Sequence, residues 1–115
     1  MVGIDIVQIA RIEKKSKDAV FLNGVFTQSE LLYYTANGSK PDTLAGFFAA
    51  KEAVAKALGI GFNGFRPNDI EIMHNELGAP HAVLKNKAKE LLANKTVHIS
   101  ISHDGGIAAA IAVLK

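Results

Sequence analysis

The sequence predicts an α+β fold in which a mostly antiparallel sheet wraps around a central apolar helix. Strand-like alternation occurs near both ends of the chain, helical patterns lie between, and strands and helices do not alternate regularly. With 115 residues, 49% of them hydrophobic and 21% charged, the chain has the composition of one folded domain, residues 1–115. A disordered chain is excluded.

The first elements are a strand and two helical segments. Residues 2–9 alternate around β-branched side chains and predict a strand. Residues 8–18 suit a short basic helix or turn. Thr27 followed by Glu30 is a capping-box pattern, so a helix is expected over residues 28–36.

The remaining elements are a long helix and two hairpins. The helix is expected to begin at Asp42 or Thr43 and to end at Gly59, its C-cap glycine. "DIEIMH" and "HAVL" flank the turn "NELGAP", and "TVHISIS" and "IAAAIAVL" flank "HDGG", so each pair predicts a hairpin. A lysine-rich amphipathic helix is expected over residues 85–94.

The long helix carries an unusual pair of charges, Lys51 and Glu52. At 100° per residue its large apolar side chains form one broad stripe, with Lys51 near the centre of that stripe and Glu52 at its edge beside alanines and Lys56. A helix that is apolar nearly all round should be buried, and a buried carboxylate must be paired or bound to a metal. An ion pair between Glu52 and Lys56 and a ligand site both remain open.

Asp5 is the second carboxylate whose position needs an explanation, because aspartate is rare in strands and Asp5 lies within a predicted one. The alternation puts Val2, Ile4 and Ile6 on one face of the strand and Gly3, Asp5 and Val7 on the other. Asp5 could hydrogen-bond a neighbouring loop, or Gly3 could make room beside it for a ligand. Together with Glu52 it would offer the two oxygen ligands that Mg²⁺ accepts when water and phosphates complete its shell.

Other candidate sites are less specific. The loop "GIGFNG" follows a helix C-terminus, which favours a cap and turn over a phosphate cradle and leaves Lys51 and Lys56 to supply positive charge. Ser102 and His103 are adjacent on a strand and project to opposite sides, which argues against a nucleophilic Ser–His pair.

Composition limits the partners and the location. The net charge of +2 is too small to indicate nucleic acid, and the absence of cysteine favours an intracellular, cytoplasmic protein. The apolar N-terminus is interrupted by Asp5 and lacks a basic leader, so neither a signal peptide nor a membrane partner is expected.

Three motifs in order, "GIDIV", "FAAKEAVAKALGIG" and "SISH", closely resemble the holo-acyl-carrier-protein synthase family, the small type of 4′-phosphopantetheinyl transferase. The resemblance spans essentially the whole chain. It implies transfer of 4′-phosphopantetheine from coenzyme A to a serine of apo-acyl carrier protein, with release of adenosine 3′,5′-bisphosphate. It also implies a homotrimer with its sites between subunits.

The resemblance assigns roles to residues as well. Asp5 and Glu52 would bind Mg²⁺ and, with Lys56, form the catalytic set, and the implied coenzyme A contacts are Lys51, Lys56, Gly59, Ser102 and His103. Because acyl carrier proteins are acidic, a basic patch is expected to dock them: Arg11, Lys14, Lys15 and Lys17. Many relatives carry arginine where this chain has Phe47, so any contact of that arginine is absent here.

Two other function classes stay open from the residues. One is a non-catalytic oligomeric module that binds nucleotides or carrier proteins. The other is a hydrolase that uses the Ser/His segment.

Overall fold

The computed structural model describes residues 1–115 and contains five strands, five α-helices and one short 3₁₀-helix. In chain order they are β1 (Val2–Gln8), α1 (Ile9–Lys15), α2 (Ala19–Val25), α3 (Gln28–Ala36), α4 (Pro41–Ala57), η1 (Pro67–Asp69), β2 (Ile70–His74), β3 (Pro80–Leu84), α5 (Asn86–Leu92), β4 (Val97–Asp104) and β5 (Ile107–Leu114). None of the helices combines the length and apolar character that crossing a bilayer requires.

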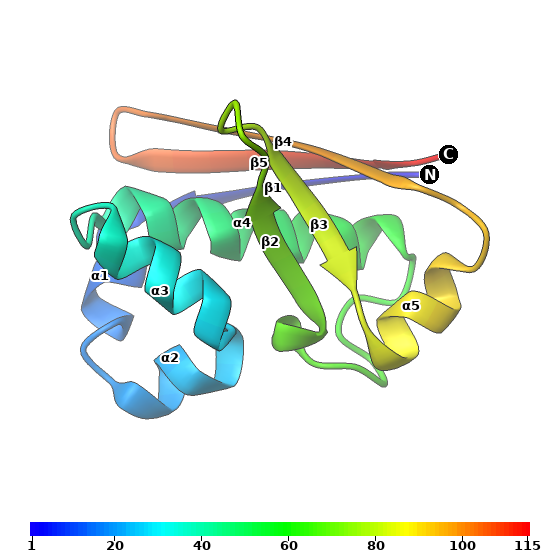
Figure 1. Cartoon of the computed structure of the whole chain (residues 1–115), viewed down its shortest axis with the longest axis horizontal. Coiled ribbons are helices and arrows are strands. Elements are labelled where there is room, and N and C mark those ends of the chain that lie inside the picture. The colour runs from blue at the N-terminus through cyan, green and yellow to red at the C-terminus, as the bar shows by residue number, and fades with distance from the viewer.

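Helix α4 is the centre of the molecule, and the strands lie on two sides of it (Figure 1). A three-stranded antiparallel sheet of order β1-β5-β4 runs along one side of the helix, and the separate hairpin β2–β3 crosses the other. The three short helices α1–α3 gather near the beginning of α4, and the two termini lie together at the far end of the sheet. The predicted α+β fold with a central apolar helix is confirmed.

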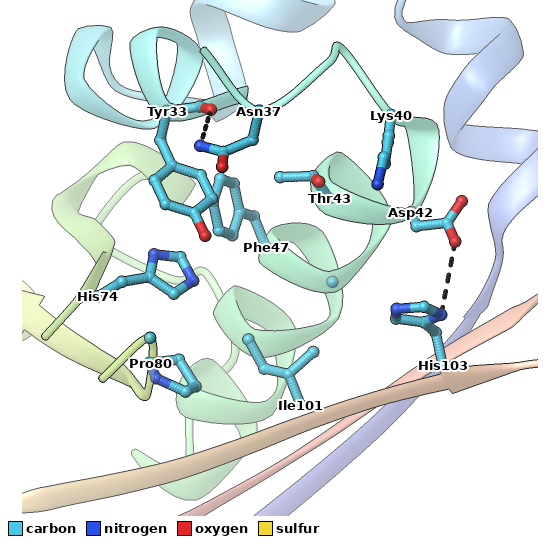
Figure 2. A pocket seen from close by; sticks show the side chains of 12 residues that line it. Tyr33, Asn37, Lys40, Asp42, Thr43, Phe47, His74, Pro80, Ile101 and His103 are labelled. Atoms are coloured by element: carbon cyan, nitrogen blue, oxygen red, sulfur yellow. Dashed lines mark hydrogen bonds and ion pairs between the residues drawn. The ribbon is translucent and has the colours of Figure 1, made fainter. Parts of the chain in front are cut away.

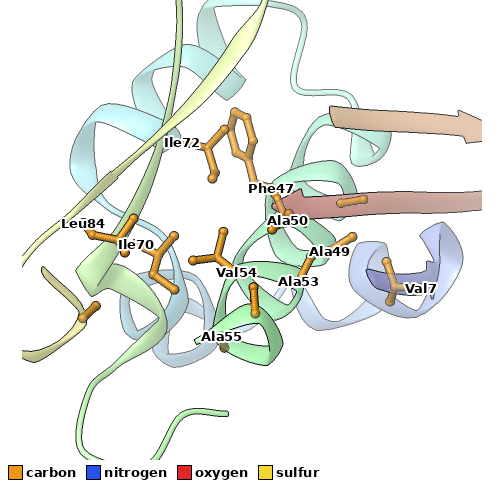
Figure 3. Packing of buried hydrophobic residues seen from close by; sticks show 14 of the residues in the cluster. Val7, Phe47, Ala49, Ala50, Ala53, Val54, Ala55, Ile70, Ile72 and Leu84 are labelled. Atoms are coloured by element: carbon orange, nitrogen blue, oxygen red, sulfur yellow. The ribbon is translucent and has the colours of Figure 1, made fainter. Parts of the chain in front are cut away.

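The two faces of α4 differ in the size of their side chains. Toward the sheet it presents alanines, including Ala49 and Ala53, both with no exposed surface. Toward the hairpin it presents larger groups, and Val54 packs there near Ile70 of β2 (Figure 3). Small residues let a helix and a strand approach closely, while the larger ones fill the wider gap beneath the hairpin.

Most predicted elements are present, with shifts at their ends. Helix α3 spans the predicted residues, and its capping box is complete: the Thr27 hydroxyl accepts from the Glu30 amide, and Glu30 accepts from the Thr27 amide. Helix α4 begins at Pro41, a residue suited to the first helical position, and ends at Ala57, so Gly59 lies two residues beyond the helix with φ 90°.

Helix α2 was not predicted. Its sequence "AVFLNGV" combines β-branched residues with glycine, so its helix propensity is low. The Asp18 side chain accepts a hydrogen bond from the Val20 amide and caps the helix, and this aspartate is the local signal that could have revealed it.

The alternation predicted for β1 is confirmed. Val2, Ile4 and Ile6 lie on the outer face of the sheet and remain 63%, 61% and 66% exposed. Gly3, Asp5 and Val7 face inward, toward α4. The outer face of this edge strand is therefore apolar and open from Val2 to Ile6.

Candidate active site

Strand β1 and helix α4 bring Asp5, Glu52 and Lys56 together along the edge of the sheet. The Lys56 ammonium lies 3.1 Å from Asp5 Oδ1 and donates a further hydrogen bond, 3.0 Å long, to the carbonyl oxygen of Ile4. Lys56 is half exposed, whereas the Asp5 side chain is mostly covered. Lys56 thus forms its ion pair with Asp5 of the strand and not with Glu52. The alternative that Glu52 only forms an ion pair with Lys56 within the helix is therefore wrong.

Glu52 experiences the negative charge of Asp5. Partial burial and the neighbouring Asp5 carboxylate raise the pKa of Glu52 above its ordinary value, while Lys56 and Arg11 oppose this rise. Two carboxylates that repel each other in a half-buried position gain from a cation placed between them. This electrostatic arrangement is what a divalent-cation site of two protein oxygens requires.

A pocket of about 420 Å³ opens at the other end of α4, where the helix meets α3, the hairpin and β4 (Figure 2). The rings of Tyr33 and His74 stack on one wall with centroids 4.1 Å apart. His103 Nδ1 lies 3.4 Å from Asp42 Oδ2 on the opposite wall, and Lys40 projects into the rim. The pocket combines flat aromatic surface with a cation and hydrogen-bonding groups.

Within one chain the two groups are separate. Ile101 is the β4 residue that shares a row with Asp5, and Ala110 of β5 lies between them. Adjacent strands are about 4.8 Å apart, so two spacings separate β4 from β1. Ser102 lies on the opposite, outer face of the sheet from Asp5. A single copy therefore does not bring Ser102 and His103 to the Asp5–Glu52–Lys56 group.

Comparison with known proteins identifies the family. The profile described as the 4′-phosphopantetheinyl transferase superfamily matches residues 1–112. The chain belongs to this superfamily. It is 44% identical to holo-acyl-carrier-protein synthase of Clostridium beijerinckii over 99% of this chain and 95% of that protein.

Solved structures of the superfamily share the fold. The Helicobacter pylori holo-acyl-carrier-protein synthase in complex with coenzyme A superposes with a TM-score of 0.90, at 38% identity and with 100% of both chains covered. A holo-acyl-carrier-protein synthase from Bacillus anthracis, in complex with coenzyme A (3′,5′-ADP), gives a TM-score of 0.83 at 33% identity, covering 98% of this chain and 93% of that one. The predicted family is confirmed.

Lys51 requires a correction. Its side chain is 1% exposed, and its ammonium lies 2.9 Å from Glu30 Oε1 and donates to the carbonyl oxygens of Pro67 and Ile70. No face of this ammonium is left for a phosphate. We therefore remove Lys51 from the coenzyme A contacts implied by the resemblance, and assign it to joining α3, α4 and the hairpin.

Gly3 and Gly59 also have structural explanations. The space beside Gly3 is filled by the backbone of α4, so the expectation that Gly3 admits a ligand is wrong. The amide of Gly59 donates to the Lys56 carbonyl in the turn that ends the helix, in agreement with a cap and turn.

Phe47 is 2% exposed and lines the pocket. Its ring centroid lies 5.8 Å from that of Tyr33 and 5.7 Å from that of His74. This position of the chain therefore supports an aromatic cluster instead of presenting a guanidinium group.

The basic patch lies on and after α1, and all four residues are exposed: Arg11, Lys14, Lys15 and Lys17. Arg11 is the member of the patch whose charge opposes the rise in the pKa of Glu52. The pocket residues Tyr33, Lys40 and His74 were missed by sequence reasoning. Their only local signal was the pair of histidines that flank the "NELGAP" turn, a stretch predicted here only as a hairpin.

Proposed function

We propose that this protein transfers the 4′-phosphopantetheine group of coenzyme A to a serine of apo-acyl carrier protein and releases adenosine 3′,5′-bisphosphate. The supporting observation within the chain is the juxtaposition of Asp5, Glu52 and Lys56 at the edge of β1. Superfamily membership gives this juxtaposition its chemical meaning. Because the reaction consumes coenzyme A, the proposal includes a cytoplasmic location.

Asp5 and Glu52 are proposed to hold Mg²⁺. Their carboxylates fit a hard cation in type and number when water and substrate oxygens complete its coordination. The pKa of Glu52 is raised first by burial and then by repulsion from Asp5, and a bound cation would offset both effects. When bound, the ion would neutralise negative charge developing on the pyrophosphate during transfer.

Lys56 supplies the mobile positive charge in this proposal. Its half-exposed ammonium is available to a phosphate oxygen near Asp5, in the way that lysines stabilise transferring phosphoryl groups. The attacking serine must lose a proton, and either Glu52 or a water that the carboxylates hold accepts it. Arg11 and the lysines after it provide the docking surface for an acidic carrier protein.

The nucleotide portion of coenzyme A is assigned to the pocket beside His103. The stacked rings of Tyr33 and His74 offer a flat surface for a base, while Lys40 and His103 offer charge and hydrogen bonds for phosphate. Ser102 and Gly59 are kept as coenzyme A contacts on the resemblance alone.

We propose a homotrimer because the resemblance implies one, and the separation of the two groups within one chain supports sites that lie between subunits. Within one chain β4 residues cannot join the carboxylates on β1, but a second copy can supply them. The exposed apolar face formed by Val2, Ile4 and Ile6 continues onto Ile111 of β5 and is the surface we assign to this contact. Ile6→Glu should then yield monomers in light scattering and lose transfer, whereas a wild-type monomer would overturn the assembly.

The function is tested by incubating the protein with coenzyme A, Mg²⁺ and an apo-acyl carrier protein, and weighing the carrier by mass spectrometry. The expected product carries one added phosphopantetheine. Asp5→Ala and Glu52→Ala should abolish it, while Glu90→Ala, which removes an exposed carboxylate on α5, should not.

Each alternative function predicts a different result. Coenzyme A binding without modification of a competent carrier favours the non-catalytic binding module. Hydrolytic activity that is lost on substitution of His103 but unchanged on substitution of Glu52 favours the hydrolase.

A further inference from the structure

Strand β1 and helix α4 meet at Gly3 with no side chain between their backbones. A β-carbon built on Gly3 would lie 2.0 Å from the carbonyl oxygen of Ala53 and 2.7 Å from the amide nitrogen of Ala57. A carbon atom normally stays about 3.3 Å or more from a carbonyl oxygen. Because both obstacles are backbone atoms, no change of rotamer can relieve the overlap.

This backbone contact lies next to the residues of the proposed site. Asp5 is two residues along β1 from Gly3 and on the same face of the strand. Glu52 and Lys56 directly precede Ala53 and Ala57 in the sequence. Their side chains therefore project from the same part of α4, about 100° around the helix axis from the contact with Gly3. The backbone distance at Gly3 therefore governs how far Asp5 stands from both helix residues.

We infer that Gly3 is a positioning residue that sets the spacing between the Asp5 carboxylate and the Glu52–Lys56 pair. The inference rests on the proposed function, because it assigns that spacing to holding a divalent cation and a phosphate. Any side chain at position 3 must push β1 away from α4 by about 1 Å at this point. Catalytic geometry tolerates such a shift poorly, at a cost of about 100-fold in rate.

The test compares Gly3→Ala with the wild-type chain, using Mn²⁺ as the probe. Electron paramagnetic resonance measures free Mn²⁺ in the presence of protein and coenzyme A, and mass spectrometry follows transfer to the carrier. We expect Gly3→Ala to bind Mn²⁺ about 10- to 100-fold more weakly. We expect its turnover number to fall about 100-fold.

The matched control is Leu84→Ala, which removes a buried side chain from β3, outside the β1–α4 contact. It should lower the thermal midpoint as a packing defect does, yet keep wild-type Mn²⁺ affinity and turnover at temperatures where it is folded. A purely structural role of Gly3 predicts that the two variants behave alike.

The outcomes separate the inference from the function on which it rests. Wild-type Mn²⁺ affinity and turnover in folded Gly3→Ala would overturn the positioning role. If the wild-type chain neither binds Mn²⁺ nor modifies the carrier, the proposed function fails, and the inference fails with it. If Gly3→Ala does not fold, Val7→Ile adds one carbon to the buried face of β1 that lies toward α4, two residues beyond Asp5. Weakened Mn²⁺ binding then supports the inference, and unchanged binding refutes it.

Discussion

Replacing Lys51 with methionine tests whether this lysine serves the fold and not the substrate. The substitution keeps an unbranched apolar side chain as far as Cε but removes the ammonium that lies 2.9 Å from Glu30 Oε1. Glu30 retains its hydrogen bonds from the amides of Thr27 and Ile72, but its charge remains buried without a counter-ion. The carbonyl oxygen of Ile70 also loses this donor, and that of Pro67 keeps only its hydrogen bond from the Ile70 amide.

The cost follows from these losses. Breaking a buried ion pair by removing one partner costs about 3–5 kcal/mol. Each buried carbonyl left without a donor costs about 1–3 kcal/mol on its own, but coupled losses do not add. We therefore expect Lys51→Met to lower the free energy of unfolding by about 4 kcal/mol. With a urea dependence of about 2 kcal/mol/M, the midpoint should move by about 2 M.

Urea unfolding followed by circular dichroism, at fixed protein concentration because assembly adds to stability, measures this cost. The double variant Glu30→Gln/Lys51→Met removes both charges of this pair. Its loss of stability should therefore be about 1–3 kcal/mol smaller than the sum of the losses of the two single variants. A cost below about 1 kcal/mol for Lys51→Met, or simple additivity, would refute the reasoning. Where Lys51→Met is folded, transfer should stay within about tenfold of wild type, whereas Lys56→Met should lose far more.

Three further predictions concern charge. The pKa of Glu52 is raised in the folded chain, so ionising this carboxyl lowers the stability of the fold at pH values above that pKa. Below the ordinary pKa of 4.5 the carboxyl is protonated in both the folded and the unfolded chain and has no such effect. Glu52→Gln should therefore raise the thermal midpoint at pH 7 but not at pH 4. Burial and His81 lower the pKa of His74 below 6.5, so the wild-type chain should lose stability as pH falls from 6.5 toward that lowered pKa. His74→Phe should flatten this pH dependence, and an unchanged slope would contradict the assignment. Mg²⁺ at 100 times its dissociation constant should stabilise the wild-type chain by about 2.7 kcal/mol, and Asp5→Asn should lose that gain in a thermal scan.

The elements set by local patterns could be predicted from the sequence. The Thr27–Glu30 capping box placed α3 because both bonds form within one turn of the chain. The alternation in β1 gave the correct inner and outer faces, since side chains in a strand have a period of two. The proximity of Asp5 and Glu52 could be predicted because each carboxylate was costly in its own element and needed a partner.

The remainder depended on contacts between distant segments. The partner of Lys51 is Glu30, 21 positions earlier, and the sequence already used Glu30 as a capping residue. One oxygen of that carboxylate accepts from the Thr27 amide and the other accepts from Ile72. The pocket was missed for the same reason, because α3, α4, the hairpin and β4 each contribute only part of its wall.

The adjacent charges Lys51 and Glu52 make sense once each is assigned to its own face of α4. Successive residues of a helix point about 100° apart, so two neighbours can occupy unrelated environments. Lys51 points beneath the hairpin, where its ammonium joins α3 to η1 and β2, and Glu52 points to the edge of β1, where Asp5 lies. Loss of the buried pair therefore loosens the contacts of α4 with α3, η1 and β2. The position of Glu52 beside Asp5 depends instead on the contact of α4 with β1 at Gly3, and this is why Lys51→Met is expected to cost stability much more than transfer.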